Sequence, residues 1–499
     1  MDFKENINIV WLKKDLRLQD HAPLFYATQS AYPTLLLYVF EPSLMNAADA
    51  DERHYRFIYQ SIIQLQQALQ PFQHQVYIAH AEVLDVFNLL QQHFSIKTIF
   101  SHQEIGNAIS FERDKSVKKF CNHHQIIWKE FPTNGIIRGL KNRSNWNKKW
   151  ISTMEQPQIH PPLQLLKSVQ LSSAISTALI TKPLSPTITT SNKNFQPGGF
   201  VYAQQYLQSF LHDRCRNYIK GISKPLESRK SCSRLSPYFT YGNLSIRQVY
   251  QAAQLAKQQN GDKRNINFFV SRLLWHCHFI QKFESKCSQE FYNVNTAFNS
   301  IRNIVDTEKL QAFVQAKTGI PIVDASILCL QQTGYINFRM RSMLVSFATQ
   351  HLWLPWQAIA PYLAKWFLDY EPGIHYPQIQ MQAGTTGINT IRMYNPVKQG
   401  QDHDANGIFV KQWLPQLAQI PNTFIHQPHT MSVMEQQLIN CIIGKDYPNP
   451  IVNITESAAY ARDILWKVKK SSEAKQQNKQ ILETLTQRKT EQESTLQFK

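Results

Sequence analysis

Short runs of apolar, β-branched or aromatic residues alternate with stretches of helical length at the start of this chain. The runs cover residues 7–12, 34–40, 75–79 and 97–100, and apolar side chains recur every three or four positions over residues 54–69 and 84–94. This alternation predicts strand–helix–strand units and therefore a parallel sheet covered by helices on both faces. We expect a Rossmann-like α/β domain over residues 1–140.

The rest of the chain divides by composition. Residues 168–199 are rich in Ser and Thr, contain several prolines and hold almost no large aromatic side chains, which is typical of a connection. Helical periodicity follows over residues 203–212, 245–258, 267–283, 308–316, 322–332, 339–351 and 356–366. We expect an interdomain linker over residues 141–200, a mainly α-helical C-terminal domain over residues 201–466, and a basic, polar tail, mobile or partly helical, over residues 467–499.

Charge and composition narrow the class of protein. The net charge of +18 predicts a polyanionic partner, and the hydrophobic share of 43% excludes a disordered chain. No apolar run reaches the ~18–20 residues that cross a bilayer, and the first residues lack the apolar segment of a secretory signal. The seven cysteines are scattered without paired spacing. We therefore expect a reduced, cytoplasmic protein with no disulfide framework and no metal site.

The segment after the first predicted strand excludes two classes of nucleotide-binding enzyme. It contains neither G-x-G-x-x-G nor G-x-x-x-x-G-K-[ST], which argues against an NAD-linked dehydrogenase and a P-loop ATPase. The segment instead reads KKDLRLQDH, in which Arg17 and Asp20 suggest a structural ion pair.

Consecutive Trp275, His276, Cys277 and His278 could suggest a metal. Ligands on one helix face need a spacing of three or four, so we expect a plain helix instead. The simplest interpretation has Trp275 and Phe279 facing the core and His276 on an intermediate flank.

Hydroxyl groups and an Arg gather in residues 231–237 (SCSRLSP), at a possible helix start. Such a segment could hold a diphosphate, although a simple helix cap explains it equally well.

A second candidate site begins with Arg341 and continues to Asp369, Glu371 and His375. An Arg on a buried helix needs a carboxylate partner, and Asp369 is the obvious one. The alternative is a buried structural salt bridge under a loop.

Four longer stretches together resemble the DNA photolyase and cryptochrome family: VWLKKDLRLQDHAPL, SRLSPYFTYGNLS, KTGIPIVDASILCLQQTGYINFRMRSM and YNPVKQGQDHDANGIFVKQWLPQL. The resemblance runs from about residue 7 to residue 415. It implies an α/β antenna domain, a long linker and a helical domain that holds FAD. In this family, light-excited reduced FAD donates an electron to a pyrimidine lesion flipped out of UV-damaged DNA, the lesion splits, and the electron returns.

The resemblance also implies roles for single residues. His375 falls opposite flavin N5, where an imidazole could donate a hydrogen bond or carry a titratable proton that makes the redox chemistry pH sensitive. Trp275 falls against the lesion, and Trp356 falls at the middle of the family's electron-transfer chain. The implied FAD contacts are Tyr218, Ser233, Arg234, Leu235, Ser236, Arg339, Arg341, Asp369, Glu371 and His375. The implied substrate contacts are Trp275, Arg272, Phe338, Ser342 and Met381.

Several positions depart from the family pattern. Ile379 and Phe313 stand where the family's other two electron-transfer tryptophans are expected, so photoreduction must use another route. The candidates for that route are Trp353, Trp366, Tyr370, Tyr376 and Tyr394. Arg272 replaces a Glu that meets the lesion, and Phe338 and Ser342 replace an Asn and a Met, which leaves the lesion type open.

The resulting hypothesis is a monomeric, blue-light-dependent deoxyribodipyrimidine photo-lyase for cyclobutane pyrimidine dimers. The alternatives are a photolyase for (6-4) photoproducts, a cryptochrome-type photoreceptor that signals through the tail, and a non-catalytic nucleic-acid binder. The family binds a folate or deazaflavin antenna pigment in the interdomain cleft, or none. Glu104, Lys118 and Lys119 lie in the relevant segment but select no pigment.

Overall fold

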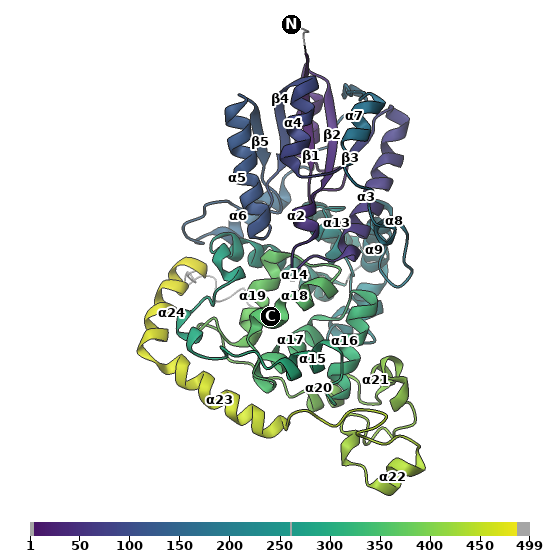
Figure 1. Cartoon of the computed structure of the whole chain (residues 1–499), viewed down its shortest axis with the longest axis vertical. Helices are drawn as coiled ribbons and strands as arrows, with labels where there is room; N and C mark the ends of the chain where they lie inside the picture. Colours follow the sequence, from purple (N-terminus) through teal and green to yellow (C-terminus); the bar gives the residue numbers. More distant parts are fainter. Residues whose placement is uncertain (1–3, 260–261, 487–499) are drawn as a thin grey trace.

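The computed structural model describes residues 4–259 and 262–486, with an α/β domain above a helical domain in the view of Figure 1. The α/β domain is built on a parallel five-stranded sheet with the strand order β3-β2-β1-β4-β5. The strands are β1 Glu5–Leu12, β2 Thr34–Phe40, β3 Val76–His80, β4 Phe94–His102 and β5 Ile127–Phe131. The predicted fold class is confirmed in both parts of the chain.

Helices cover both faces of the sheet, which explains why every residue of β2 is buried. Alternate residues of β1 enter two apolar clusters: Ile7 and Trp11 join the cluster that contains Phe87, and Val10 joins the one that contains Phe57. The second cluster continues into the helical domain. The helices of the α/β domain are α1 Ala22–Thr28, α2 Pro42–Met45, α3 Glu52–Leu69, α4 Val83–His93 and α5 Ala108–His123.

The four predicted strands are present, with β3 one residue later than expected. β5 lies at the edge of the sheet and carries no apolar run. Its sequence IWKEF exposes Ile127 and Lys129, so the pattern does not reveal a strand.

The connection between the domains packs along the sheet. It contains α6 Trp146–Glu155, α7 Ser173–Ala178 and α8 Pro186–Thr189. Ser168 pairs with Thr34 in an isolated bridge, and Leu179 is buried in the cluster on the α4 side of the sheet.

The helical domain confirms the seven helical stretches that periodicity predicts. Its longer helices are α9 Phe200–His212, α13 Ile246–Gln259, α14 Lys263–Glu284, α15 Thr307–Val314, α16 Pro321–Thr333, α17 Phe338–Ser346, α18 Trp356–Trp366 and α19 Pro372–Ala383. Shorter ones are α10 Tyr218–Gly221, α11 Ser228–Ser231, α12 Ser236–Thr240, α20 Pro396–His403, α21 Ile408–Trp413 and α22 Val433–Leu438. The predicted stretch 339–351 divides into α17 and a π-helical turn over Phe347–His351.

Helix α19 is concealed in the sequence by two prolines. Pro372 occupies the first turn, where the missing N–H costs little, and Pro377 lies inside the helix.

Two helices, α23 Ile454–Lys470 and α24 Ser472–Leu485, end the described chain and run along the outside of the helical domain (Figure 1). In α24, Ile481 and Leu485 are buried against Val294, and Asn295 donates to the main-chain oxygen of Ala474 (3.1 Å). The predicted tail is therefore helical and packed up to this point, and residues 487–499 lie outside the described residues.

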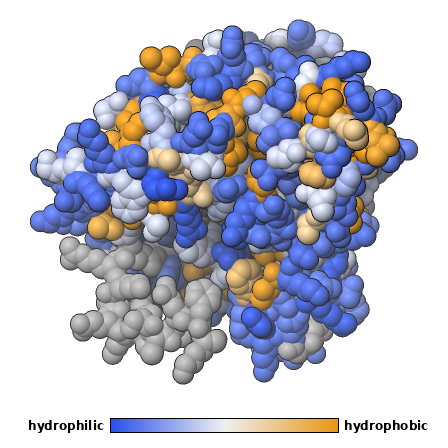
Figure 2. Space-filling view, turned by 90° about the horizontal axis from the view of Figure 1, so that it is seen from below, coloured by the Kyte–Doolittle hydropathy of each residue, from blue (hydrophilic) through white to orange (hydrophobic). Residues whose placement is uncertain are grey.

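The described helices include none that is both long and apolar enough to span a membrane. The end of the molecule shown in Figure 2 is mostly hydrophilic, with apolar side chains in separate patches.

The turn that follows β1 docks onto the helical domain through main-chain contacts. The Leu16 N–H donates to the Tyr241 oxygen (3.1 Å), and the Asn243 side-chain amide donates to the Leu16 oxygen (3.0 Å). Arg17 Nη1 donates to the Gly242 oxygen (3.0 Å). We call these contacts the domain seam.

The predicted ion pair between Arg17 and Asp20 is wrong. Arg17 Nη2 donates to the main-chain oxygen of Asp20 (3.1 Å), and the Asp20 carboxylate instead accepts from Ser245 Oγ (2.6 Å) and Arg247 Nη1 (3.3 Å). Both side chains therefore form hydrogen bonds to residues of the helical domain. The spacing of Arg17 and Asp20 in the sequence cannot indicate such long-range partners.

Gly242 provides a test of the seam. Its φ is +69°, and an added Cβ would lie 2.2 Å from the Lys14 oxygen, whereas Gly139 has the same φ with no neighbouring atom within 4 Å. Gly139→Ala should cost only the backbone strain of about 1–2 kcal/mol. Gly242→Ala should cost the same strain and, in addition, the free energy of displacing the seam. Each further kcal/mol of lost folding stability lowers Tm by ~2–4 °C. Thermal unfolding of both variants measures the difference, and equal Tm values would contradict it.

Candidate functional site

A cavity in the helical domain is enclosed by α17, residues 367–371 and α19. It holds about 540 Å³ of empty space, its open mouth included. We call it the helical-domain cavity. Its lining residues are Phe338, Arg341, Ser342, Val345, Phe367, Asp369, Tyr370, Glu371, Ile374, His375, Gln378, Ile379 and Gln382.

Arg341 and Asp369 form a two-pronged ion pair at this cavity, as the sequence predicts. Nη1 and Nη2 each lie 3.0 Å from a carboxylate oxygen, and Nε donates to the Ile336 oxygen (3.0 Å). Burial raises the pKa of Asp369, but Arg341 outweighs it, and Ser236 acts in the same direction, so the pKa lies below its usual value. The pair is therefore ionised at neutral pH, with the guanidinium 4.1 Å from the Phe367 ring centroid.

Glu371 stands between the two domains at the start of α19. Its carboxylate lies 3.6 Å from Nζ of Lys14, which follows β1. Burial raises the pKa of Glu371 to about 7, against the opposing effect of Lys14. Its charge therefore depends on the domains remaining docked.

His375 lies in the cavity wall with Nε2 3.0 Å from the Ala360 oxygen. Because a carbonyl only accepts, Nε2 carries the proton and Nδ1 is left as an acceptor. Burial lowers the pKa of His375 to about 4. The ring is therefore neutral at neutral pH, and of the two predicted roles a titratable proton would act only in the acidic range.

Several buried polar atoms at the cavity lack a protein partner. They are Ser342 Oγ, Gln378 Oε1 and both side-chain amide atoms of Gln382. Buried polar atoms are nearly always hydrogen-bonded. The cavity therefore fits a ligand that carries several polar atoms along an aromatic or apolar body.

The loop before α12 presents a buried cation. Arg234 has φ +61°, donates from Nη2 to Gln196 Oε1 (2.7 Å), and lies 3.6 Å from the Tyr335 ring centroid. Its Nε is buried without a partner, and among the described residues it pairs with no acidic side chain. A buried cation of this kind suits an anionic ligand such as a diphosphate.

The other predicted residues of this region have different positions. Ser236 begins α12 and approaches Asp369, which connects the loop to the cavity. Ser233 is half-buried, whereas Leu235 and Tyr218 are core side chains, with Tyr218 packed edge-on against Phe210.

Three positioning residues escape motif reasoning. Arg214 donates to the main-chain oxygens of Lys230 (3.1 Å) and Ser233 (3.3 Å) and so holds the loop. Gln196 lies in the linker, where the composition gives no indication of a binding residue. Tyr335 lies inside one of the family-like stretches and could have been found there.

Arg339 and Arg341 do not share the cavity. The Arg339 guanidinium lies 5.8 Å from the Tyr394 ring, outside the cavity lining. Residues two apart on a helix face different directions, so only one of the two arginines can meet Asp369.

The predicted substrate residues divide into two groups. Phe338, which is 50% exposed, and Ser342 line the cavity. Trp275 and Arg272 are exposed on α14, and Met381 is half-buried on α19, none of them in the cavity lining. Trp275 is 46% exposed, so the interpretation with Trp275 facing the core is wrong, whereas Phe279 is buried and His276 is intermediate.

The electron-transfer positions lie as follows. Trp356 is buried, donates from Nε1 to Asn293 Oδ1 (2.8 Å), and lies 6.3 Å from the Tyr376 ring. Ile379 lines the cavity, and Phe313 is fully buried. Of the alternative donors Trp353, Trp366, Tyr370, Tyr376 and Tyr394, Tyr370 lines the cavity.

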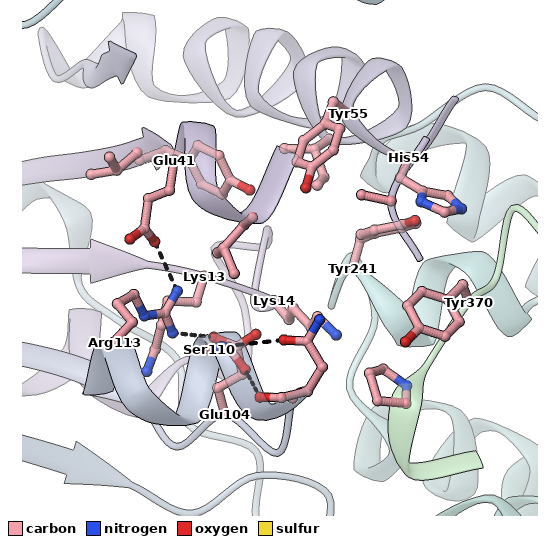
Figure 3. A pocket seen from close by; sticks show the side chains of 18 of the residues that line it. Lys13, Lys14, Glu41, His54, Tyr55, Glu104, Ser110, Arg113, Tyr241 and Tyr370 are labelled. Carbon is pink, nitrogen blue, oxygen red and sulfur yellow. Dashed lines mark hydrogen bonds and ion pairs between the residues drawn. The ribbon is translucent and has the colours of Figure 1, made fainter. Parts of the chain in front are cut away.

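A second cavity lies between the domains and holds about 770 Å³ of empty space, its open mouth included; Figure 3 shows it. Arg113 pairs there with Glu41 (2.8 Å) and Glu104 (2.6 Å). Burial raises the pKa of Glu41 to about 7 even beside Arg113. Lys118 and Lys119 are exposed and outside the lining, so the antenna pigment remains unassigned. We call this space the interdomain cavity.

One group in the described chain has the spacing of metal ligands: Asp15, His21 and His102. Asp15 Oδ2 lies 2.7 Å from His102 Nδ1 and 3.1 Å from His21 Nε2, while His21 Nδ1 accepts from the Leu24 N–H. This is a buried hydrogen-bond network around one carboxylate, and the absence of a metal stays a prediction.

Comparison with known proteins agrees with this geometry. A family model for DNA photolyase matches residues 8–141, and one for the FAD binding domain of DNA photolyase matches residues 269–467. A deoxyribodipyrimidine photo-lyase of Alkalihalophilus pseudofirmus is 25% identical over 91% of this chain and 96% of its own length. A cryptochrome DASH of Synechocystis sp. is 26% identical over 91% of this chain and 97% of its own length.

Solved structures share the whole fold. A cryptochrome of Synechocystis sp. has a TM-score of 0.84 and 23% identity, covering 93% of this chain and 100% of its own. A class III photolyase of Agrobacterium tumefaciens has a TM-score of 0.79 and 22% identity, covering 94% and 99%.

The chain belongs to the DNA photolyase and cryptochrome family, and its cofactor is FAD. The unpartnered polar atoms of the helical-domain cavity and the unpaired Arg234 fit such a group, which needs polar partners along its rings and a cation at its phosphates.

Asp369→Ala tests this placement. Removing the carboxylate leaves Arg341 without its partner. Because the Arg341 side chain is 24% exposed, this should cost less than the ~3–5 kcal/mol of a fully buried pair, and it should reduce the FAD retained through purification. Glu112→Ala, which breaks an exposed pair with Lys115 (2.7 Å), is the control and should change little. Flavin absorbance per protein measures the outcome, and full FAD content in Asp369→Ala would contradict the placement.

Proposed function

We propose that this protein repairs cyclobutane pyrimidine dimers in UV-damaged DNA, with light as the energy source and reduced FAD as the electron donor. The observation that carries the proposal is the lining of the helical-domain cavity, which combines the half-exposed ring of Phe338 with the ion pair of Arg341 and Asp369. Such a lining suits a base taken out of the helix, which needs an aromatic surface to stack on and a space to enter.

The residues of the cavity bind and orient the cofactor and exclude water from it. Arg341 and Asp369 hold each other in one geometry, and Arg234 offers its charge to the phosphates. His375 contributes an acceptor rather than a charge. FAD, when bound in its reduced form, supplies the electron on absorbing light. The net charge of +18 supports binding to the DNA backbone.

Repair itself is the direct test. Reduced holoprotein, incubated with an oligonucleotide that contains one thymine dimer, should remove the dimer under blue light and not in the dark, as followed by chromatography. An oligonucleotide with a (6-4) photoproduct is the second arm. If only the (6-4) photoproduct is lost, that lesion replaces the cyclobutane dimer as the proposed substrate. If neither lesion is lost, the repair proposal is overturned and the photoreceptor alternative is favoured.

The resemblance to the family implies that Trp275 meets the lesion, and its ring is exposed on α14, outside the lining of the helical-domain cavity. Trp275→Ala should weaken binding of dimer-containing DNA by about 1–3 kcal/mol through lost stacking, and leave binding of undamaged duplex unchanged. Trp466→Ala is the control, because Trp466 is similarly exposed (39%) but lies on α23. Fluorescence anisotropy with both DNAs measures the effect, and equal losses on the two would remove Trp275 from the lesion site.

A further inference from the structure

Two tyrosines share one carboxylate beside the helical-domain cavity. The Tyr370 hydroxyl donates to Oδ2 of Asp49, and the Tyr376 hydroxyl lies 3.5 Å from the same oxygen and 3.5 Å from the Tyr370 hydroxyl. Asp49 is 7% exposed and comes from the segment between α2 and α3, so the cluster forms only when the domains dock.

Tyr370 has a special position in this cluster. It lines both the helical-domain cavity and the interdomain cavity, and Figure 3 shows it on the wall of the latter. Among the described residues that line the helical-domain cavity, it is the one tyrosine or tryptophan. It is therefore the oxidisable side chain that a ligand in that cavity would meet.

Further aromatic rings lead from Tyr370 into the helical domain. The His375 ring lies 5.1 Å from that of Tyr370 and 5.2 Å from that of Tyr376. The Tyr376 ring lies 6.3 Å from Trp356. By contrast, Ile379 has no aromatic ring, and the ring of Phe313 carries no hydroxyl or indole nitrogen that would make it easy to oxidise.

A phenol gives up an electron readily only when its proton leaves at the same time. Burial and its neighbours Tyr376 and Asp49 raise the pKa of Tyr370 well above the usual value, so the group is protonated before light arrives. A carboxylate already hydrogen-bonded to the hydroxyl is placed to take that proton.

We propose that Tyr370 is the electron donor for photoreduction of bound FAD, with Asp49 as the proton acceptor and Tyr376 as the next donor. This inference rests on the proposed function insofar as FAD occupies the helical-domain cavity. Tyr370 loses one electron to light-excited oxidised FAD and its hydroxyl proton to Oδ2 of Asp49, which leaves a neutral tyrosyl radical and a neutral carboxyl group. Tyr376 can then transfer a hydrogen atom from its hydroxyl to Tyr370. A dissolved thiol returns a hydrogen atom to the tyrosyl radical and becomes a thiyl radical.

The experiment illuminates oxidised holoprotein with blue light in the presence of dithiothreitol. Flavin absorbance gives the rate of photoreduction, and electron paramagnetic resonance of freeze-trapped samples identifies the radical. Wild-type protein grown with ring-deuterated tyrosine should show the narrowed signal of a tyrosyl radical, and photoreduction should be slower in D₂O. A signal from tryptophan alone would overturn the proposal without any variant having to fold.

The variants are Tyr370→Phe and Asp49→Asn, which preserve shape, with Tyr362→Phe as the control. Tyr362 packs against Trp366 and lines neither cavity. We expect Tyr370→Phe and Asp49→Asn, at matched FAD content, to slow photoreduction by about tenfold or more, as loss of a charge-assisted hydrogen bond implies. Tyr362→Phe should match wild type. Wild-type rates in Tyr370→Phe would overturn the proposal.

Failure of this inference is distinguishable from failure of the proposed function. Dimer repair by chemically reduced wild-type protein needs no photoreduction, so that assay reports on repair alone. The radical signal and the photoreduction rate need no DNA, so they report on Tyr370 and Asp49 alone.

Discussion

Docking of the turn after β1 onto residues 241–243 holds the two domains together around the interdomain cavity. The seam places Lys14 beside Glu371 and closes the space between the domains. Gly242 permits the close approach because any Cβ there would overlap the Lys14 oxygen. The interdomain cavity therefore depends on a few hydrogen bonds, each of which is accepted by a main-chain oxygen.

Several buried charges in this protein have a polar or charged partner close by. Arg341 and Asp369 neutralise each other, Arg113 is surrounded by carboxylates, and the Asp15 carboxylate lies against the imidazoles of His21 and His102. Burying an ion without such a partner is costly. Arg234 differs from these three groups, since its charge meets a ring and an amide and no carboxylate, which leaves it available to an anionic ligand.

The fold was largely predictable, and its failures have physical causes. Apolar periodicity located the inner strands and most helices because those segments are buried on a regular face. β5 lies at an edge, and α19 contains Pro377, so neither carries the usual pattern. The polar composition of the tail indicated a solvent-exposed segment. Helix α24 nevertheless buries Ile481 and Leu485 on one face, and the mean composition of the segment does not reveal that face.

The amino-acid sequence by itself determined the family, the α/β and helical classes of the two domains, and the pairing of Arg341 with Asp369. These follow from local periodicity and from motifs whose chemistry admits few partners. Tertiary structure alone decided that Arg17 contacts main-chain oxygens, that His375 is neutral, and that Asp49 joins Tyr370 and Tyr376. The reason is that burial and long-range contact set the pKa of an imidazole and the partner of a hydroxyl, and sequence spacing carries neither.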